Sequence, residues 1–112
     1  MHVGDLDGSS QRIMGKNWKA IVTVAVHDSD ELPLANVIVS GYWNGDSSDT
    51  KSCFTDANGQ CNVTSGKLND SQQGNVTFSV DDLSLAPYSY QSADNHDQDG
   101  DSDGTAISVS GP

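Results

Sequence analysis

The sequence is poor in basic residues, cysteine and glutamate, and these shortages restrict its function. Only 5 Lys and Arg stand against 16 Asp and Glu, which gives a net charge of −11. Such a negative field repels phosphate backbones and anionic lipids, so we expect neither nucleic acid nor a membrane as a partner. Two cysteines are too few for a zinc site built on thiolates. No run approaches the ~20 apolar residues that cross a bilayer, which predicts a soluble domain.

Motifs of catalysis are missing as well. The sequence contains no G-x-S-x-G nucleophile elbow, no H-E-x-x-H zinc motif and no Gly-rich loop for phosphate. Pairs of aspartates occur, but a chain of 112 residues offers no deep cleft that would raise the pKa of one carboxyl for glycosidase chemistry. We therefore expect a domain that is not an enzyme.

Helical periodicity is absent, and short stretches alternate instead between apolar and polar residues. From Trp18 to Val26 every second residue is apolar, which is the period of a half-buried strand. Further strands are predicted at residues 35–43, 75–80, 88–90 and 105–110. Seven or eight short strands with Gly, Asn and Asp turns predict one immunoglobulin-like Greek-key β-sandwich over residues 1–112.

The aromatic residues allow two interpretations. Trp18 and Trp43 fall on the inward positions of their strands, so we expect both in the core. The alternative is a sugar-stacking platform formed by Tyr42, Trp43, Tyr88 and Tyr90, in which Tyr42 faces outward.

The two cysteines flank a turn. Between Cys53 and Cys61 lies Asp56-Ala57-Asn58-Gly59, which has the Asp and Gly positions of a type I turn. If the turn closes a hairpin, the cysteines face each other on neighbouring strands. A disulfide between them is then predicted, worth roughly 2–3 kcal/mol on the chain-entropy model. The alternative is a pair of reduced thiols in a cytosolic hairpin.

An aspartate-rich segment near the C-terminus predicts a calcium site. Asp99, Asp101 and Asp103, followed by Gly104, fit the D-x-D-x-D-G start of a calcium loop, in which alternate oxygens converge on one cation. The bidentate glutamate of an EF-hand is missing, because Ser110 stands at the twelfth loop position. The remaining ligands must therefore come from elsewhere in the fold.

Immunoglobulin-like topology suggests where those ligands lie. The start of the first strand, the loop after the second strand and the last loop meet at one pole of such a sandwich. Asp97, Asp5 and Asp7 are therefore the expected additional ligands, with Asp28 and Asp30 at the same pole. Convergent carboxylates are unfavourable without a cation, which supports a bound Ca²⁺. The alternative is a solvated acidic loop without metal.

Two histidines fall near the same pole. His2 and His96 could bring zinc or nickel there, but the surrounding ligands are hard oxygens, which favour calcium. We therefore expect both to be ordinary surface histidines.

Motifs along nearly the whole chain resemble a known family. They are Met1-His2-Val3-Gly4-Asp5-Leu6-Asp7-Gly8, Trp18-x-Ala20 leading into Val22-Thr23-Val24, Pro33-x-Ala35-x-Val37-x-Val39-x-Gly41-x-Trp43, Cys53 to Cys61 around Thr55-Asp56-x-x-Gly59, Asn95-His96-Asp97, and Asp101-Ser102-Asp103-Gly104-Thr105. Together they resemble an immunoglobulin-like accessory module found towards the C-terminal end of secreted bacterial enzymes, often subtilisin-like or other peptidases. The resemblance implies a β-sandwich, export and an appended role, and it brings no catalytic residue into this sequence.

These observations predict an accessory or spacer domain of an exported enzyme, stiffened by calcium and one disulfide. Its partner would be the covalently linked catalytic domain. The opening residues lack the basic and apolar regions of a signal peptide, so export is expected to depend on a segment outside this sequence. The alternatives are a targeting module that binds a polysaccharide or protein substrate, which an exposed aromatic row would favour, and an adhesin-type structural repeat.

Overall fold

The fold is built from eight strands and one short 3₁₀ helix in the part of the chain that the structure describes. The computed structural model describes residues 1–13, 15, 17–45, 49–69, 75–96 and 103–110. Among them, no helix is long and apolar enough to cross a membrane. The elements are β1 (His2–Arg12), β2 (Asn17–His27), β3 (Ile38–Gly45), β4 (Asp49–Phe54), β5 (Gln60–Thr64), β6 (Leu68–Asn69), β7 (Asn75–Ser84), the 3₁₀ helix η1 (Ser92–Asp94) and β8 (Ala106–Ser110).

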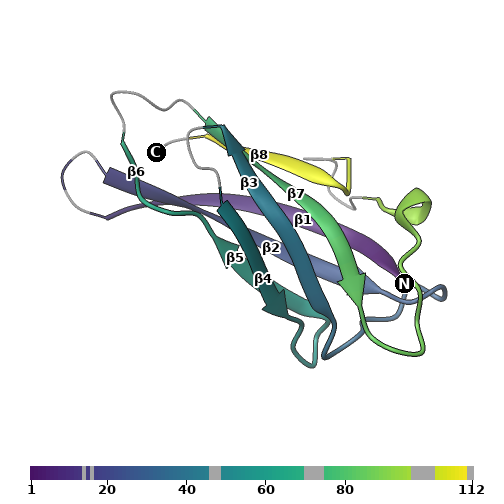
Figure 1. Cartoon of the computed structure of the whole chain (residues 1–112). Coiled ribbons are helices and arrows are strands. Elements are labelled where there is room, and N and C mark those ends of the chain that lie inside the picture. The colour runs from purple at the N-terminus through teal and green to yellow at the C-terminus, as the bar shows by residue number, and fades with distance from the viewer. Residues whose placement is uncertain (14, 16, 46–48, 70–74, 97–102, 111–112) are drawn as a thin grey trace.

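The strands form two antiparallel sheets that pack face to face (Figure 1). One sheet has the order β1-β2-β5, with β6 pairing with the start of β2, and the other has the order β4-β3-β7-β8. The chain therefore changes sheet after β2, after β4 and after β6. This confirms the predicted all-β Greek-key sandwich. In constant-type immunoglobulin domains the fourth strand joins the first sheet, whereas here β4 lies beside β3 in the second.

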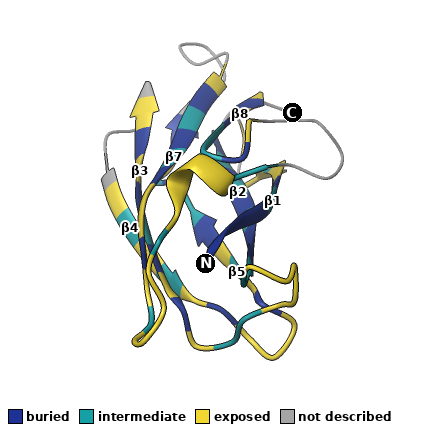
Figure 2. Ribbon diagram, turned by 90° about the vertical axis from the view of Figure 1, so that its right-hand side faces the viewer, coloured by how far each residue is buried: buried dark blue, intermediate teal, exposed yellow. Residues whose placement is uncertain are grey.

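The core lies between the sheets, and buried residues recur along the strands of both (Figure 2). In β2 the predicted alternation is confirmed, because its apolar residues from Trp18 to Val26 at every second position are all buried. Trp43 is also buried and packs against Phe78, with ring centroids 5.2 Å apart. Both tryptophans therefore belong to the core, and neither forms part of an exposed aromatic row. Tyr42 faces outward, as predicted.

The disulfide joins the two sheets at one edge of the sandwich. Cys53 in β4 and Cys61 in β5 are bonded, with Cα atoms 5.9 Å apart. The turn between them is present, since the Gly59 N–H donates to the Asp56 carbonyl at 2.9 Å. The predicted disulfide is thus confirmed. The predicted hairpin is wrong, because β4 and β5 belong to different sheets and the chain crosses between sheets at this turn.

Residues 88–90, for which we predicted a strand, do not form one. Tyr88 makes only an isolated bridge to Leu85. The stretch belongs to the long connection from β7 to β8, part of which lies against the start of β1: the Met1 amino group donates to the Ser89 carbonyl at 2.7 Å. This connection brings residues 95 and 96 to the pole where β1 begins and β2 ends.

Candidate metal centre

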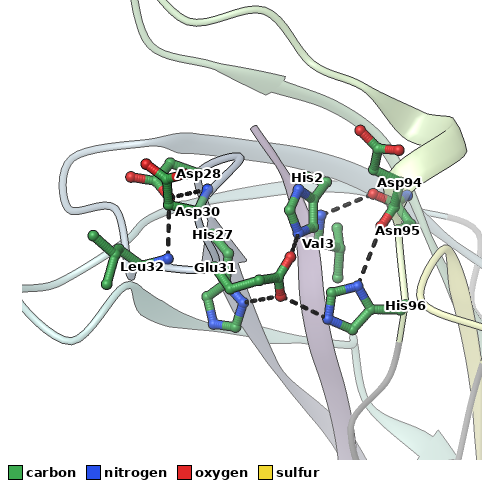
Figure 3. Close-up of polar contacts among 10 residues, drawn as sticks. All are labelled: His2, Val3, His27, Asp28, Asp30, Glu31, Leu32, Asp94, Asn95 and His96. Carbon is green, nitrogen blue, oxygen red and sulfur yellow. Dashed lines mark hydrogen bonds and ion pairs between the residues drawn. The ribbon is translucent and has the colours of Figure 1, made fainter.

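Three separate segments bring three histidines and one glutamate together at this pole (Figure 3). His2 is at the start of β1, directly opposite His27 at the end of β2. Glu31 lies in the turn that follows β2, and His96 lies in the connection between β7 and β8. One donor atom from each of the four residues lies within 4.8 Å of all the others. The predicted meeting of these three segments at one pole is confirmed.

The turn after β2 directs Glu31 back towards the histidines. The Asp28 carboxylate accepts hydrogen bonds from the N–H groups of Asp30 and Leu32 at 2.8 and 3.0 Å, which closes the turn. Glu31 adopts a φ of 64°, in the left-handed region that residues with a side chain seldom occupy. Such a conformation is unfavourable by itself and clusters at functional sites. Here it accompanies a carboxylate that faces three imidazoles.

The Glu31 carboxylate contacts all three rings. Its Oε1 lies 2.6 Å from His2 Nε2, and its Oε2 lies 3.0 Å from His96 Nε2 and 3.4 Å from His27 Nδ1. Partial desolvation raises the pKa of Glu31, but the contact with His2, aided by His27 and His96, lowers it more. The net pKa of Glu31 is below its usual value, so the carboxyl is anionic at neutral pH.

His2 is the most buried member of the cluster. Its side chain is 5% exposed, compared with 49% for Glu31. The His2 Nε2 atom is close to the Glu31 carboxylate but makes no hydrogen bond of good geometry with it, so this buried nitrogen has no hydrogen-bond partner among the described residues. The expectation that His2 is an ordinary surface residue is therefore wrong. Burying a polar nitrogen in this way is unfavourable unless it meets a proton or a cation.

The position of the His27 ring depends on Gly4. A β-bulge interrupts the β1–β2 pairing between Val3 and Asp5, and Gly4 is the residue at the bulge. A Cβ on Gly4 would overlap the His27 ring at Nδ1 and Cε1. The missing side chain at position 4 thus gives the imidazole its place beside the cluster.

His96 contacts a backbone carbonyl with one ring nitrogen and the Glu31 carboxylate with the other. Its Nδ1 lies 3.2 Å from the Asp94 carbonyl oxygen, which can only accept, so Nδ1 carries the proton. In a neutral ring this leaves the Nε2 lone pair facing the Glu31 carboxylate, and two electron-rich atoms 3.0 Å apart repel each other. A second proton or a cation between them removes the repulsion. A backbone carbonyl on the far nitrogen is the usual outer partner of metal-bound histidine.

The predicted calcium ligands are only partly within the described residues. Asp97, Asp99 and Asp101 lie outside them. Asp5 and Asp7 lie on β1, opposite Ala25 and Thr23, and Asp7 is exposed. Binding of Ca²⁺ by the acidic segment therefore remains a prediction.

Asp103 is described, and one of its oxygens already has partners. Its Oδ1 accepts hydrogen bonds from the N–H groups of Ala106 and Thr105 at 2.9 and 2.8 Å, which lower the pKa of the Asp103 carboxyl. The bonds form a turn that starts β8. A cation at this residue would therefore have to bind the second carboxylate oxygen.

The sequence predicts that these segments meet, but its motifs point to their aspartates as the ligands. His27 and Glu31 do not stand out in the sequence, because His27 continues the pattern of β2 and Glu31 lies among turn-forming residues. A signal was available: the chain has three histidines and one glutamate. All four fall in the segments that immunoglobulin-like topology brings to one pole.

None of the protein families, curated proteins or solved structures compared with this chain matches it. The resemblance to accessory modules of secreted enzymes therefore remains an expectation.

Proposed function

We propose that this domain binds a transition metal ion, with zinc as the best match, through His2, His27, Glu31 and His96. The observation that carries the proposal is the convergence of four donor atoms within 4.8 Å from three segments far apart in the chain. A tetrahedral zinc ion with bonds of about 2.0–2.1 Å holds its ligands about 3.3 Å apart, so donors that now lie up to 4.8 Å apart would have to approach one another by at most about 1.5 Å.

The kinds of donor atom in the cluster indicate which metal ions fit it. Imidazole nitrogen suits zinc, copper, nickel and iron, whereas calcium and magnesium take oxygen ligands. Copper(II) binds imidazole sites more tightly in general, but it prefers a tetragonal arrangement, while four protein donors in a closed shell are typical of structural zinc. The net charge of −11 further favours any cation at the surface.

The proposed role of the ion is structural. A metal at this site would tie the start of β1 to the turn after β2 and to the connection before β8. Because a ligand that binds only the folded state stabilises it, zinc at 100 times its Kd would add about 2.7 kcal/mol to the free energy of unfolding. This role fits a non-catalytic module better than a reaction centre, since four protein donors leave no position for a substrate.

Isothermal titration calorimetry of metal-free protein tests the proposal, with Glu31→Gln and its neighbour Asp30→Asn as a matched pair. Both variants lose one negative charge in the same exposed turn, but only Glu31 faces the histidines. We expect one zinc per chain, and an affinity lowered by roughly 10-fold or more in Glu31→Gln. Asp30→Asn should bind like the parent. Equal affinities in both variants, or no zinc binding at all, would contradict the site.

We propose further that the domain is an accessory or spacer module of an exported protein. The disulfide supports this role, because such bonds persist in oxidising compartments. The shape supports this role too, because the sandwich is elongated and measures 44 × 23 × 21 Å. β1 starts at the pole where the histidines lie, and β8 ends beside the start of β7 at the other end. Expressing the domain with neighbouring segments of its gene and measuring their separation by small-angle scattering tests the spacer role. A collapsed arrangement would contradict it.

A further inference from the structure

One side of β1 is covered by the connection between β7 and β8. Among the described strands β1 pairs only with β2, so its other edge is free of strands. Residues 89–96, which we name the strap, run along the start of this edge. The Met1 amino group donates to the Ser89 carbonyl at 2.7 Å, and the Gln91 N–H donates to the Met1 carbonyl at 2.8 Å. The strap thus satisfies backbone groups that an exposed edge would leave open.

The strap also bonds to Val3, partly through the side chain of Asn95. The Val3 N–H donates to the Asn95 Oδ1 at 2.8 Å, and the His96 N–H donates to the Val3 carbonyl at 3.0 Å. The Asn95 Nδ2 donates to the Tyr90 hydroxyl at 2.7 Å and to the Thr105 Oγ1 at 3.1 Å. Asn95 therefore joins β1, the strap and the residue before β8 at one point, immediately before the metal-facing histidine.

Gly104 lies directly against the backbone of His96. A Cβ on Gly104 would lie 2.6–2.8 Å from the backbone N, C and O atoms of His96, and Gly104 has a φ of 83°. Residues 96 and 104 therefore lie directly against each other at this pole. This close approach leaves His96 little freedom to shift while the strap is docked.

We propose that Asn95 is the positioning residue for His96, and that metal binding locks the strap onto the edge of β1. The inference rests on the proposed metal site. His2 belongs to β1 and His96 to the strap, so one ion can bind both only when the strap is docked. A ligand that binds the docked form better shifts the population towards it, and docking raises metal affinity by the same factor.

Hydrogen–deuterium exchange and zinc titration of Asn95→Ala test the proposal. The matched control is Asn62→Ala, which removes the Oδ1 that accepts a hydrogen bond from the Thr23 hydroxyl on the same sheet, away from the pole. In the parent we expect zinc to slow amide exchange in peptides covering residues 1–4 and 89–96. Asn95→Ala should lose roughly 10–100-fold in zinc affinity, as outer-shell changes do, and its strap should exchange quickly. Asn62→Ala should behave like the parent.

A gentler variant keeps the test decisive if Asn95→Ala fails to fold. Tyr90→Phe removes only the hydroxyl that accepts from Asn95, and should weaken zinc binding by a few-fold relative to the parent. If zinc binds the parent without slowing amide exchange in the strap, this inference is overturned, but the proposed metal site is not. Parent-like zinc affinity in folded Asn95→Ala, or in Tyr90→Phe where the first variant is unfolded, would also overturn this inference. A parent that binds no zinc would overturn both this inference and the proposed function.

Discussion

Gly4 lies against the imidazole of His27, so closely that a Cβ on residue 4 would overlap the ring. This contact offers a way to disturb the metal centre without removing a ligand. Gly4→Ala should displace the His27 ring and lower zinc affinity by roughly 10-fold or more. Titration calorimetry measures the loss, and Gly8→Ala on the same strand is the control.

The Gly8→Ala control distinguishes a local effect on the metal site from a general disturbance of β1. A Cβ on Gly8 would meet Val109 Cγ2 at 2.8 Å, so Gly8→Ala disturbs packing against β8, away from the histidines. We expect Gly8→Ala to lower the melting temperature while keeping zinc affinity. Zinc binding that is equally weak in both variants would show that β1 geometry in general, and not the His27 position, sets the affinity.

The disulfide should contribute measurably to stability. It closes a short loop and joins the two sheets, so Cys53→Ser with Cys61→Ser should lower the free energy of unfolding by roughly 2–3 kcal/mol on the chain-entropy model. Urea unfolding of the parent and the double variant measures the difference. Thiol titration of the denatured, unreduced parent should find no free sulfhydryl, and two thiols per chain would contradict the bond.

The sequence predicts the sandwich well, because alternation within a strand reports directly which side faces the core. It predicts the disulfide but not that the disulfide joins two sheets, since a turn between two strands has the same sequence pattern within one sheet or between two. It does not delimit β1 well, where glycine, serine and aspartate weaken the alternation after Leu6. The His–Glu cluster depends on a bulge at Gly4 and on the strap, which are tertiary features that no local pattern specifies.

Asp103 should make stability depend on pH in metal-free buffer. Hydrogen bonds from the Ala106 and Thr105 N–H groups lower its pKa in the folded state. Its stabilising effect is thus complete above the pKa of the unfolded chain and is lost as the pH falls through the lower, folded value. Thermal melts of Asp103→Asn, which keeps an acceptor oxygen but cannot titrate, should vary less with acid pH than melts of the parent. Identical profiles would contradict this role.

The calcium prediction can be tested separately from the zinc site by adding calcium to protein already loaded with zinc. If the aspartate segment binds Ca²⁺, adding calcium to zinc-loaded protein should raise the melting temperature by several degrees, and Asp101→Ala should abolish the increase. Glu31→Gln, which alters the histidine cluster, should retain it. Melting that is insensitive to calcium would indicate a solvated acidic segment.

X-ray absorption at the zinc edge tests the central claim most directly, because it reports the atoms bound to the ion. Protein loaded with one zinc should show a four-coordinate shell at about 2.0–2.1 Å, with the outer scattering of three imidazole rings. His96→Gln should reduce that imidazole signal by one ring. A shell made of oxygen alone, without imidazole scattering, would place the ion on the aspartates and contradict the histidine site.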